Sequence, residues 1–307
     1  MNRALELAVR GGRAVAPNPM VGAVIVKNGR IIGEGWHKRF GRSHAEVNAI
    51  RSVRRSADLH GATLYVTLEP CRHWGKTPPC SEAIAKAGIK RVVAGSHDPS
   101  QKGNRVEFLK GLIARQCQEL NNFFFTWATK KRPYITVKIA VSADGFIAGL
   151  GGKPIRITNK AQDRLVHQLR ARHQAVMVGI STVLTDDPLL TVRHVKGPDP
   201  LRVILDSRLR IPRQAKVLRD NHYLIATCVR RPRKTLNTWV SPTRKQVNLK
   251  KLFTHLAQQG ISSVLVEPGP TLYRSLQKSS LVDEWIILIG KKKIKRGIPF
   301  IRAESGK

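Results

Sequence analysis

The sequence predicts an α/β protein built from two domains. Short apolar runs typical of strands alternate with segments in which apolar residues recur at helical spacing, and this order favours a sheet covered by helices. A length of 307 residues is enough for two domains that each bury a core. A stretch at 121–132 separates the two halves, so we expect a first domain at 1–122 and a second at 132–307.

Local signals place the elements in order. Asn28-Gly29 is a strong hairpin signal between two apolar strands. Ser43 precedes a helical pattern and is the expected N-cap. The expected helices lie at 3–13, 44–53, 80–87 and 160–172, the expected strands lie at 21–26, 30–35, 63–68, 91–95, 134–142, 175–178, 202–206 and 223–226, and a strand, a tight loop and a helix start follow over 264–272.

His44, Cys71 and Cys80 form a candidate ligand set for one zinc ion. Zinc binds imidazole nitrogen and thiolate sulfur tetrahedrally, and a catalytic site leaves its fourth position to water. Glu46 stands two residues after His44 and is not needed as a ligand, so it can move protons as a general acid and base. A His-x-Glu followed by Pro-Cys and a second Cys is typical of zinc-dependent nucleobase deaminases.

Two buried core thiols are the competing interpretation of Cys71 and Cys80, because free cysteine is usually a small buried hydrophobe. The joint pattern favours the metal. Eight residues separate the two cysteines, where the general signature has two. This insert must loop away from the metal and return to it. Its hydrogen-bond donors suit the wall of a pocket for a polar, phosphorylated substrate.

The net charge of +35 is extreme for an enzyme that acts on a small molecule. A basic surface attracts polyanions, so nucleic acid is an alternative partner. However, the charge is spread along the chain, and aromatic residues make up only 6% of it, too few for a platform on which bases stack. We therefore expect no nucleic-acid partner, although a few cations would serve a phosphorylated substrate.

The four cysteines predict no disulfide framework in a chain of this length. Two are assigned to zinc, and Cys117 and Cys228 are isolated, which fits a reducing cytoplasm. The chain has no apolar run of 18 or more residues and begins without the layout of a secretion signal, so we expect neither a membrane span nor export. A homo-oligomer is compatible with the sequence.

The first half resembles the bifunctional riboflavin-biosynthesis enzymes, which join a pyrimidine deaminase to an NADPH-dependent ribosyl reductase. The likeness is carried by P-C-R-H-W-G-K-T-P-P-C at 70–80, N-P-M-V-G at 18–22 and T-L-E-P-C at 67–71. It implies a cytidine-deaminase-like three-layer domain followed by a dihydrofolate-reductase-like domain. It also implies that the residues binding the deaminase substrate, a phosphoribosyl-pyrimidine, are Asn18, His73, Lys76, Thr77 and Asp98.

Asn18 and Lys76 each have a plainer interpretation, as a turn residue before proline and a solvated loop lysine. The resemblance tips Asn18 towards the base and makes Lys76 the best candidate for the phosphate. Ser100 stands where the family has Asn, and the segment at 101–120 looks shortened, which puts the edge of the pocket after Asp98 in question.

The second half is similar to the reductase domain through Y-I-T-V-K-I-A-V-S-A-D-G at 134–145, the stretch 179–193 and V-E-P-G-P-T-L at 266–272. Arginine suits the substrate phosphate because its planar fork donates two hydrogen bonds, and the helix start at 270 suits a cofactor phosphate. The resemblance implies substrate binding by Lys138, Arg170, Leu190, Arg193 and Glu267, and NADPH binding by Val141, Thr182, Asp186, Ser207, Gly269, Pro270, Thr271 and Leu272.

This half also departs from the family. Arg156 stands where an aromatic residue is usual, and Pro268 replaces a small one. After residue 290 the chain becomes strongly basic and stops tens of residues before the family does. We therefore expect a C-terminally shortened reductase with an exposed sheet edge and a weakened or lost activity.

The reading that joins these observations is a flavin-biosynthesis enzyme of two steps, a zinc-dependent deamination followed by an NADPH-dependent reduction of the ribosyl group to ribityl. Three alternatives stay open. The first is a deaminase of tRNA or single-stranded DNA, the second is a deaminase with a degenerate reductase, and the third is a non-catalytic remnant that still binds zinc or cofactor.

Overall fold

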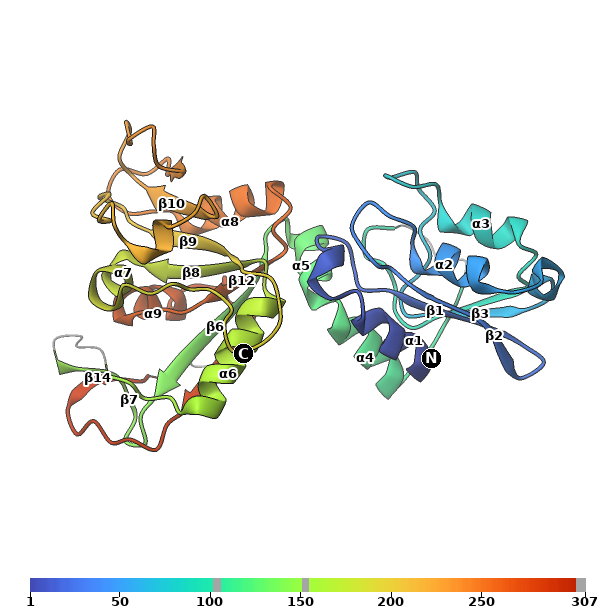
Figure 1. The fold of residues 1–307 in the computed structure, drawn as a ribbon, viewed down its shortest axis with the longest axis horizontal. Coiled ribbons are helices and arrows are strands. Elements are labelled where there is room, and N and C mark those ends of the chain that lie inside the picture. The colour runs from blue at the N-terminus through green and yellow to red at the C-terminus, as the bar shows by residue number, and fades with distance from the viewer. Residues whose placement is uncertain (102–105, 151–154, 302–307) are drawn as a thin grey trace. The chain divides into compact units, whose positions relative to one another are not determined.

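The computed structural model describes residues 1–101, 106–150 and 155–301, so the end of the expected second domain at 302–307 lies outside the described residues. The chain divides by its contacts into two units, Met1–Arg132 and Pro133–Lys307, each with its own sheet (Figure 1). Within the described ranges, no helix has the length and apolar character that a membrane crossing requires.

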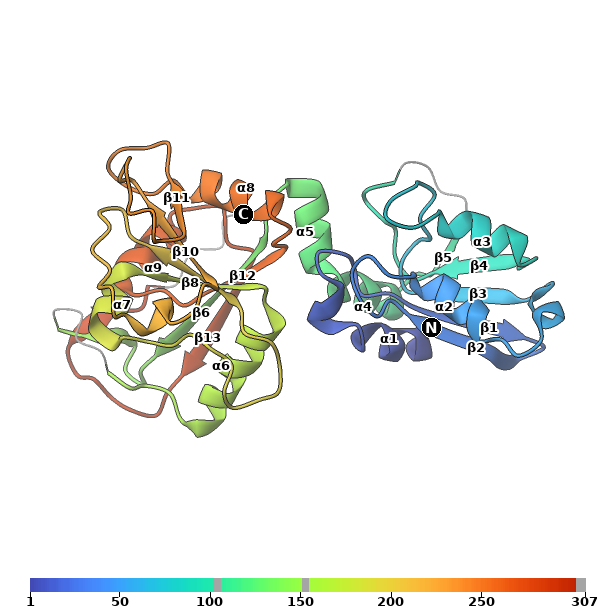
Figure 2. The same cartoon turned by 45° about the horizontal axis from the view of Figure 1, so that its top comes forward.

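The first unit is built on a five-stranded mixed sheet, visible in Figure 2. The Asn28-Gly29 turn, with Asn28 at φ 50°, closes the expected antiparallel hairpin. In sheet order the strands are β2 (Arg30–Trp36), β1 (Gly22–Lys27), β3 (Thr63–Val66), β4 (Arg91–Ala94) and β5 (Glu107–Phe108). Strand β4 pairs with β3 on one side and with β5 on the other, and both pairings are parallel.

Helices cover both faces of this sheet, because successive side chains of a strand point to opposite faces. Ala23 and Ile25 of β1 pack into the cluster that contains Ala45 and Cys80, whereas Val24 packs against Leu7 on the other face. The result is three layers, helix, sheet and helix. The helices are α1 (Asn2–Val9) on one face, and α2 (Ala45–Ser52) and α3 (Cys80–Lys86) on the other.

Gly35 lets α2 lie unusually close to β2. A Cβ atom at Gly35 would stand 2.3 Å from the backbone nitrogen of Ala49 and 2.5 Å from the carbonyl oxygen of Ala45. Only a residue without a side chain tolerates this approach. The first turn of α2 is thereby held against the sheet, and this turn carries Glu46.

Two features of the first unit differ from the expectation. The N-cap of α2 is His44 rather than Ser43, and no side-chain capping bond is present. The stretch expected to separate the halves forms a helix, α5 (Asn122–Lys130), preceded by α4 (Leu112–Leu120). Phe124 and Phe125 of α5 pack against the core of the first unit, so apolar burial made this segment part of that unit.

The second unit has a seven-stranded sheet whose six strand pairings are all parallel. Two apolar clusters lie on its two faces, one around Phe253 and one around Val217. The sheet order is β11 (Thr238–Val240), β10 (Tyr223–Thr227), β9 (Leu201–Leu205), β8 (Ala175–Gly179), β12 (Ser263–Val266), β6 (Tyr134–Val141) and β13 (Glu284–Ile289).

Strand β13 lies at one end of this sheet, and Ile289 at the end of the strand is 69% exposed. A separate antiparallel ribbon pairs β14 (Gly297–Pro299) with β7 (Phe146–Gly149). The segment at 180–186, within the stretch 179–193, forms a short helix that ends where Asp187 takes φ 38°. The helices are α6 (Lys160–Arg172), α7 (Ile180–Asp186), α8 (Leu249–Gln258) and α9 (Pro270–Gln277).

Candidate functional site: a zinc centre and a second pocket

The three predicted metal ligands meet in the first unit. His44 stands at the start of α2, Cys80 starts α3, and Cys71 lies in the loop after β3. The Nδ1 atom of His44 is 3.2 Å from the Cys80 sulfur and 3.5 Å from the Cys71 sulfur. All three ligand atoms lie within 4.8 Å of one another, and this is the one such group in the described residues.

This geometry fits zinc. Bonds of about 2.1 Å to nitrogen and about 2.3 Å to sulfur at a tetrahedral angle separate the two ligand atoms by about 3.6 Å. A metal needs the thiolate form. Hydrogen bonds from Cys80 and His44 lower the pKa of the Cys71 thiol against the effect of its burial, and the backbone N–H of Cys80 donates to the Cys71 sulfur at 3.3 Å.

Thr77 supports the imidazole from behind. Its hydroxyl lies 3.4 Å from Nε2 of His44, the nitrogen that faces away from the sulfurs. Second partners of this kind orient a ligating histidine. Thr77, expected to touch the substrate, is therefore placed to hold a metal ligand as well.

We expect the variant Cys80→Ser to lose zinc. Cys80 is fully buried, and a hydroxyl is a much poorer zinc ligand than a thiolate. Because bound metal stabilises the folded state, the first unit should also unfold at a lower temperature. Zinc per chain, measured by mass spectrometry, should fall from about one to near zero. The matched control is Cys117→Ser, a buried cysteine outside the cluster; loss of zinc from the control alone would contradict the assignment.

A cavity of about 330 Å³ opens beside the ligands, and Glu46 lies in its wall. Glu46 is 3% exposed, and burial raises the pKa of its carboxyl to about 7. A carboxyl that titrates near neutrality can both take and give a proton. Asn18, His73 and Asp98 also line this cavity.

A smaller cavity of about 130 Å³ shares Asn18 and His73 with the first and adds Lys76 and Thr77. The structure thus brings all five predicted substrate residues of this half together. Lys76 lies 4.1 Å over the ring of Phe40, which positions its ammonium group at the cavity. The Asp98 carboxylate is less available to a substrate, because it already accepts hydrogen bonds from the Ser100 backbone and hydroxyl and from the side-chain amide of Gln101.

His37 is a pocket residue that the motifs did not reveal. Its Nδ1 lies 3.2 Å from the carbonyl oxygen of Ser43, so Nδ1 carries the proton and donates it. Its Nε2 must then accept from the amide nitrogen of Asn18 at 3.3 Å. Burial lowers the pKa of His37, which keeps the ring neutral as this arrangement requires. The amide oxygen of Asn18 is therefore the atom left for a ligand.

Glu69 is the second missed residue. Its side chain is 2% exposed, and it accepts from Arg72 at 2.9 Å and pairs with Nδ1 of His97 at 2.6 Å. It also accepts from the backbone of Asp98 at 3.3 Å. Glu69 was visible in the T-L-E-P-C motif, but the motif alone gave no reason to place it in the pocket wall.

The second unit holds a cavity of about 280 Å³ between the ends of its central strands. Gly269 lines it, and a Cβ atom there would stand 3.1 Å from the Thr182 hydroxyl. Ile157 faces this cavity, whereas the neighbouring Arg156 pairs with Asp163. Of the predicted residues, Lys138, Thr182, Asp186, Glu267, Gly269, Pro270, Thr271 and Leu272 line it.

A neighbouring cavity of about 250 Å³ shares Thr271 and Leu272 with this one and contains the predicted Ser207. Arg208 and Arg210 also line it, and sequence reasoning had not singled them out. Two guanidinium groups beside a hydroxyl suit a phosphate ester, so the pair of cavities fits a phosphorylated dinucleotide.

Four predicted residues have other positions. Val141 and Leu190 are buried in apolar clusters. Arg193 is bound through its backbone to His167. Arg170 was expected to hold a phosphate, but its guanidinium forms two hydrogen bonds with Glu267, at 2.7 and 3.0 Å, and is largely buried. The Arg170 guanidinium is therefore paired with the Glu267 carboxylate.

The Glu267 pair makes the second unit sensitive to acid. Burial would raise the pKa of Glu267, but Arg170 and Lys138 outweigh it and lower the pKa to about 2. The unfolded value is about 4.3. A depressed folded pKa means that the stabilisation is complete above the unfolded pKa and is lost as the pH falls through the folded one.

We therefore expect Glu267→Gln to lower the free energy of unfolding by about 3 kcal/mol at pH 7, because it leaves Arg170 buried without its partner. The difference in free energy of unfolding between the variant and the unmodified chain should shrink as the pH falls from about 4.5 to about 2. Thermal unfolding over this pH series measures it. A deficit that is the same at both ends of the series would contradict the ion pair.

Comparison with known proteins decides the family. The zinc-binding region of cytidine and deoxycytidylate deaminases matches residues 1–96, and the RibD C-terminal domain matches residues 133–292. The riboflavin biosynthesis protein RibD of Aquifex aeolicus is 40% identical over 97% of this chain and 88% of its own length. The chain belongs to the RibD family. Its RibD counterpart in Escherichia coli is 39% identical over 95% of this chain and 87% of its own.

A solved RibD structure agrees in fold over both halves. The diaminohydroxyphosphoribosylaminopyrimidine deaminase/5-amino-6-(5-phosphoribosylamino)uracil reductase of Thermotoga maritima is 37% identical, with a TM-score of 0.87 over 100% of this chain and 91% of that one. The predicted deaminase and dihydrofolate-reductase-like halves are thereby confirmed. As a RibD the chain is a deaminase and a reductase of riboflavin biosynthesis that uses zinc and NADPH.

Proposed function

We propose that the first unit deaminates 2,5-diamino-6-(5-phosphoribosylamino)pyrimidin-4-one and that the second reduces the ribosyl group of the product to ribityl. The observation that carries this proposal is the placement of a three-ligand metal site and a proton carrier, Glu46, in one chain with a cavity suited to NADPH. The identity to RibD proteins over nearly the whole chain supports the same pair of reactions.

In the first reaction, His44, Cys71 and Cys80 would hold zinc, which when bound would supply the Lewis acidity that makes water a nucleophile near neutral pH. Glu46 takes the proton that the water gives up and passes it to the departing amino group, which leaves as ammonia. Its pKa of about 7 suits both transfers. The amide oxygen of Asn18 accepts from the base edge, and Lys76 attracts the phosphate.

In the second reaction, NADPH supplies the hydride, and the protein binds and orients both partners. Thr182, Gly269 and the start of α9 would hold the nicotinamide half of the cofactor, and Ser207 with Arg208 would hold its phosphorylated ribose. Lys138 lies 3.7 Å from Glu267 at the wall of the cavity and is placed to contact the ribosyl group. The presence of these groups favours a working reductase over a degenerate one.

We also propose that the enzyme works in the cytoplasm on this small molecule rather than on nucleic acid. All four cysteines are free in the structure, as a reducing compartment requires. The cations at the substrate cavities serve single phosphates, and the two pockets account for only a few of the 55 Lys and Arg residues.

The order of the two steps tests the proposal. Purified zinc-loaded protein should release ammonia from the diaminopyrimidine nucleotide without NADPH, and it should oxidise NADPH only after ammonia has formed. NADPH oxidation before deamination would contradict the proposed order. Ammonia release from tRNA or single-stranded DNA, with none from the nucleotide, would replace it with the nucleic-acid alternative.

A further inference from the structure

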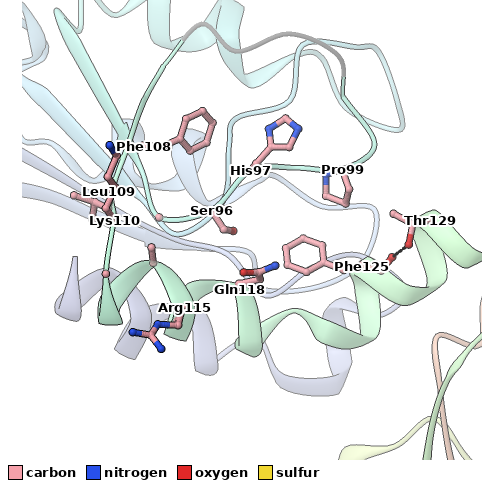
Figure 3. A pocket seen from close by; sticks show the side chains of 13 residues that line it. Ser96, His97, Pro99, Phe108, Leu109, Lys110, Arg115, Gln118, Phe125 and Thr129 are labelled. Carbon is pink, nitrogen blue, oxygen red and sulfur yellow. Dashed lines mark hydrogen bonds between the residues drawn. The ribbon is translucent and has the colours of Figure 1, made fainter. Parts of the chain in front are cut away.

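A third cavity of the first unit lies outside the zinc pocket and has no part in the reactions described above. It has a volume of about 830 Å³ and lies between the loop after β4, strand β5 and helices α4 and α5 (Figure 3). Strands β4 and β5 are parallel. Parallel neighbours are usually joined through a helix that covers the sheet, but the described residues between these strands form none. The cavity lies beside β5, where Phe108 and Leu109 line it.

Aromatic rings and unpaired cations line this space. Figure 3 shows the rings of Phe108, His97 and Phe125 around it, with Phe108 and His97 in edge contact at 5.8 Å. Lys110 and Arg115 also line it, and within the described part of the chain neither side chain forms an ion pair. Rings favour a planar aromatic ligand, and cations without carboxylates favour an anion.

The remaining lining adds an amide, Gln118, whose side chain has no hydrogen-bond partner among the described residues, and the exposed hydroxyl of Thr129. Apolar walls with a few polar groups are typical of small-molecule sites, and the volume falls within their usual range of about 300–1,000 Å³. Among the described residues that line the cavity, none is acidic.

One contact leads from this cavity to the zinc pocket. His97 is 46% exposed, and its Nδ1 pairs at 2.6 Å with Glu69, whose carboxylate is buried in the wall of the zinc pocket. Glu69 also binds the backbone of Asp98 and stands two residues before Cys71. A ligand that moves His97 removes one partner of a buried carboxylate, which must then rearrange.

We propose that this cavity is an effector site for a planar heteroaromatic phosphate, and that its occupation weakens substrate binding in the zinc pocket through His97 and Glu69. The effector differs from the deaminase substrate in its position and acts on KM rather than on the chemical step. The change in KM rests on the proposed deamination, whereas binding of the effector is measured without either reaction, so failure of the two can be told apart.

The probe is riboflavin 5′-phosphate, whose ring fluorescence reports stacking, titrated into the full chain with saturating NADPH so that the reductase pocket is filled. The test variant is Lys110→Glu with Arg115→Glu. The control is Arg54→Glu with Lys90→Glu, two exposed cations elsewhere on the same unit that change the net charge equally. Riboflavin without its phosphate and inorganic phosphate are titrated separately.

We expect the flavin phosphate to bind the unmodified chain and the control alike, and the test variant about tenfold more weakly. Riboflavin and inorganic phosphate should each bind more weakly than the two combined in one molecule. The bound probe should raise KM for deamination about fivefold in the unmodified chain and leave reduction unchanged. Absence of binding, equal weakening in the control, equal affinity in the test variant, or an unchanged KM would each overturn the proposal.

Discussion

Glu46→Gln should abolish most deamination, by roughly 10³-fold in kcat, while the protein keeps its zinc and its reductase activity. The amide has nearly the shape of the carboxyl but cannot carry a proton between water and the amino group. Glu46 is buried, and burial raises its pKa to about 7, so it is suited to proton transfer at neutral pH. The measurements are ammonia release, zinc per chain, and NADPH oxidation with deaminated substrate.

A matched control for Glu46 is Glu82→Gln, an exposed glutamate in the first turn of α3. This variant should deaminate at the normal rate. A Glu46→Gln protein within tenfold of normal activity would remove Glu46 from the mechanism. Loss of zinc from Glu46→Gln would instead show that the carboxylate is a ligand, contrary to the three-ligand site.

Lys138→Ala should have the opposite effect and lower kcat/KM for reduction by about 10²-fold with deamination unchanged, the size expected when one charged contact near the reacting group is lost. The Lys138 ammonium lies at the wall of the 280 Å³ cavity in the second unit, 3.7 Å from Glu267. The control is Lys160→Ala, an exposed lysine at the start of α6. An equal loss in both half-reactions would count against separate sites.

Mixing the two variants gives a further check on this separation. Glu46→Gln supplies an intact reductase and Lys138→Ala an intact deaminase, so the mixture should carry out both steps although neither variant does alone. Failure of the mixture, with both half-reactions intact when assayed separately, would mean that the intermediate must stay on one chain.

The zinc centre was predictable from sequence because its chemistry is local. A metal of this kind accepts few ligand types, and the motifs around His44, Cys71 and Cys80 name them directly. The sheet of the second half was predictable for a similar reason, since β8 and β12 carry continuous apolar runs at 175–178 and 264–266, as is typical of parallel strands buried on both faces.

Other features depend on tertiary contacts that local signals do not reveal. Ser43 has the chemistry of an N-cap, but the helix begins one residue later, at the backbone of the metal ligand. Arg170 has the chemistry of a phosphate ligand, but only the fold shows that Glu267, 97 residues away, occupies its fork. The chain has ten histidines, and no motif surrounds His37, so its contact with Asn18 could only be found in three dimensions.

The central claim is a metal bound by one imidazole and two sulfurs, with the Glu46 carboxylate free. X-ray absorption at the zinc edge on the purified protein tests this most directly, with Glu46→Gln measured beside it. We expect two sulfur scatterers and one imidazole, and the same spectrum from the variant. A spectrum with fewer than two sulfurs, or one in which an oxygen shell changes when Glu46 is replaced, would contradict the account.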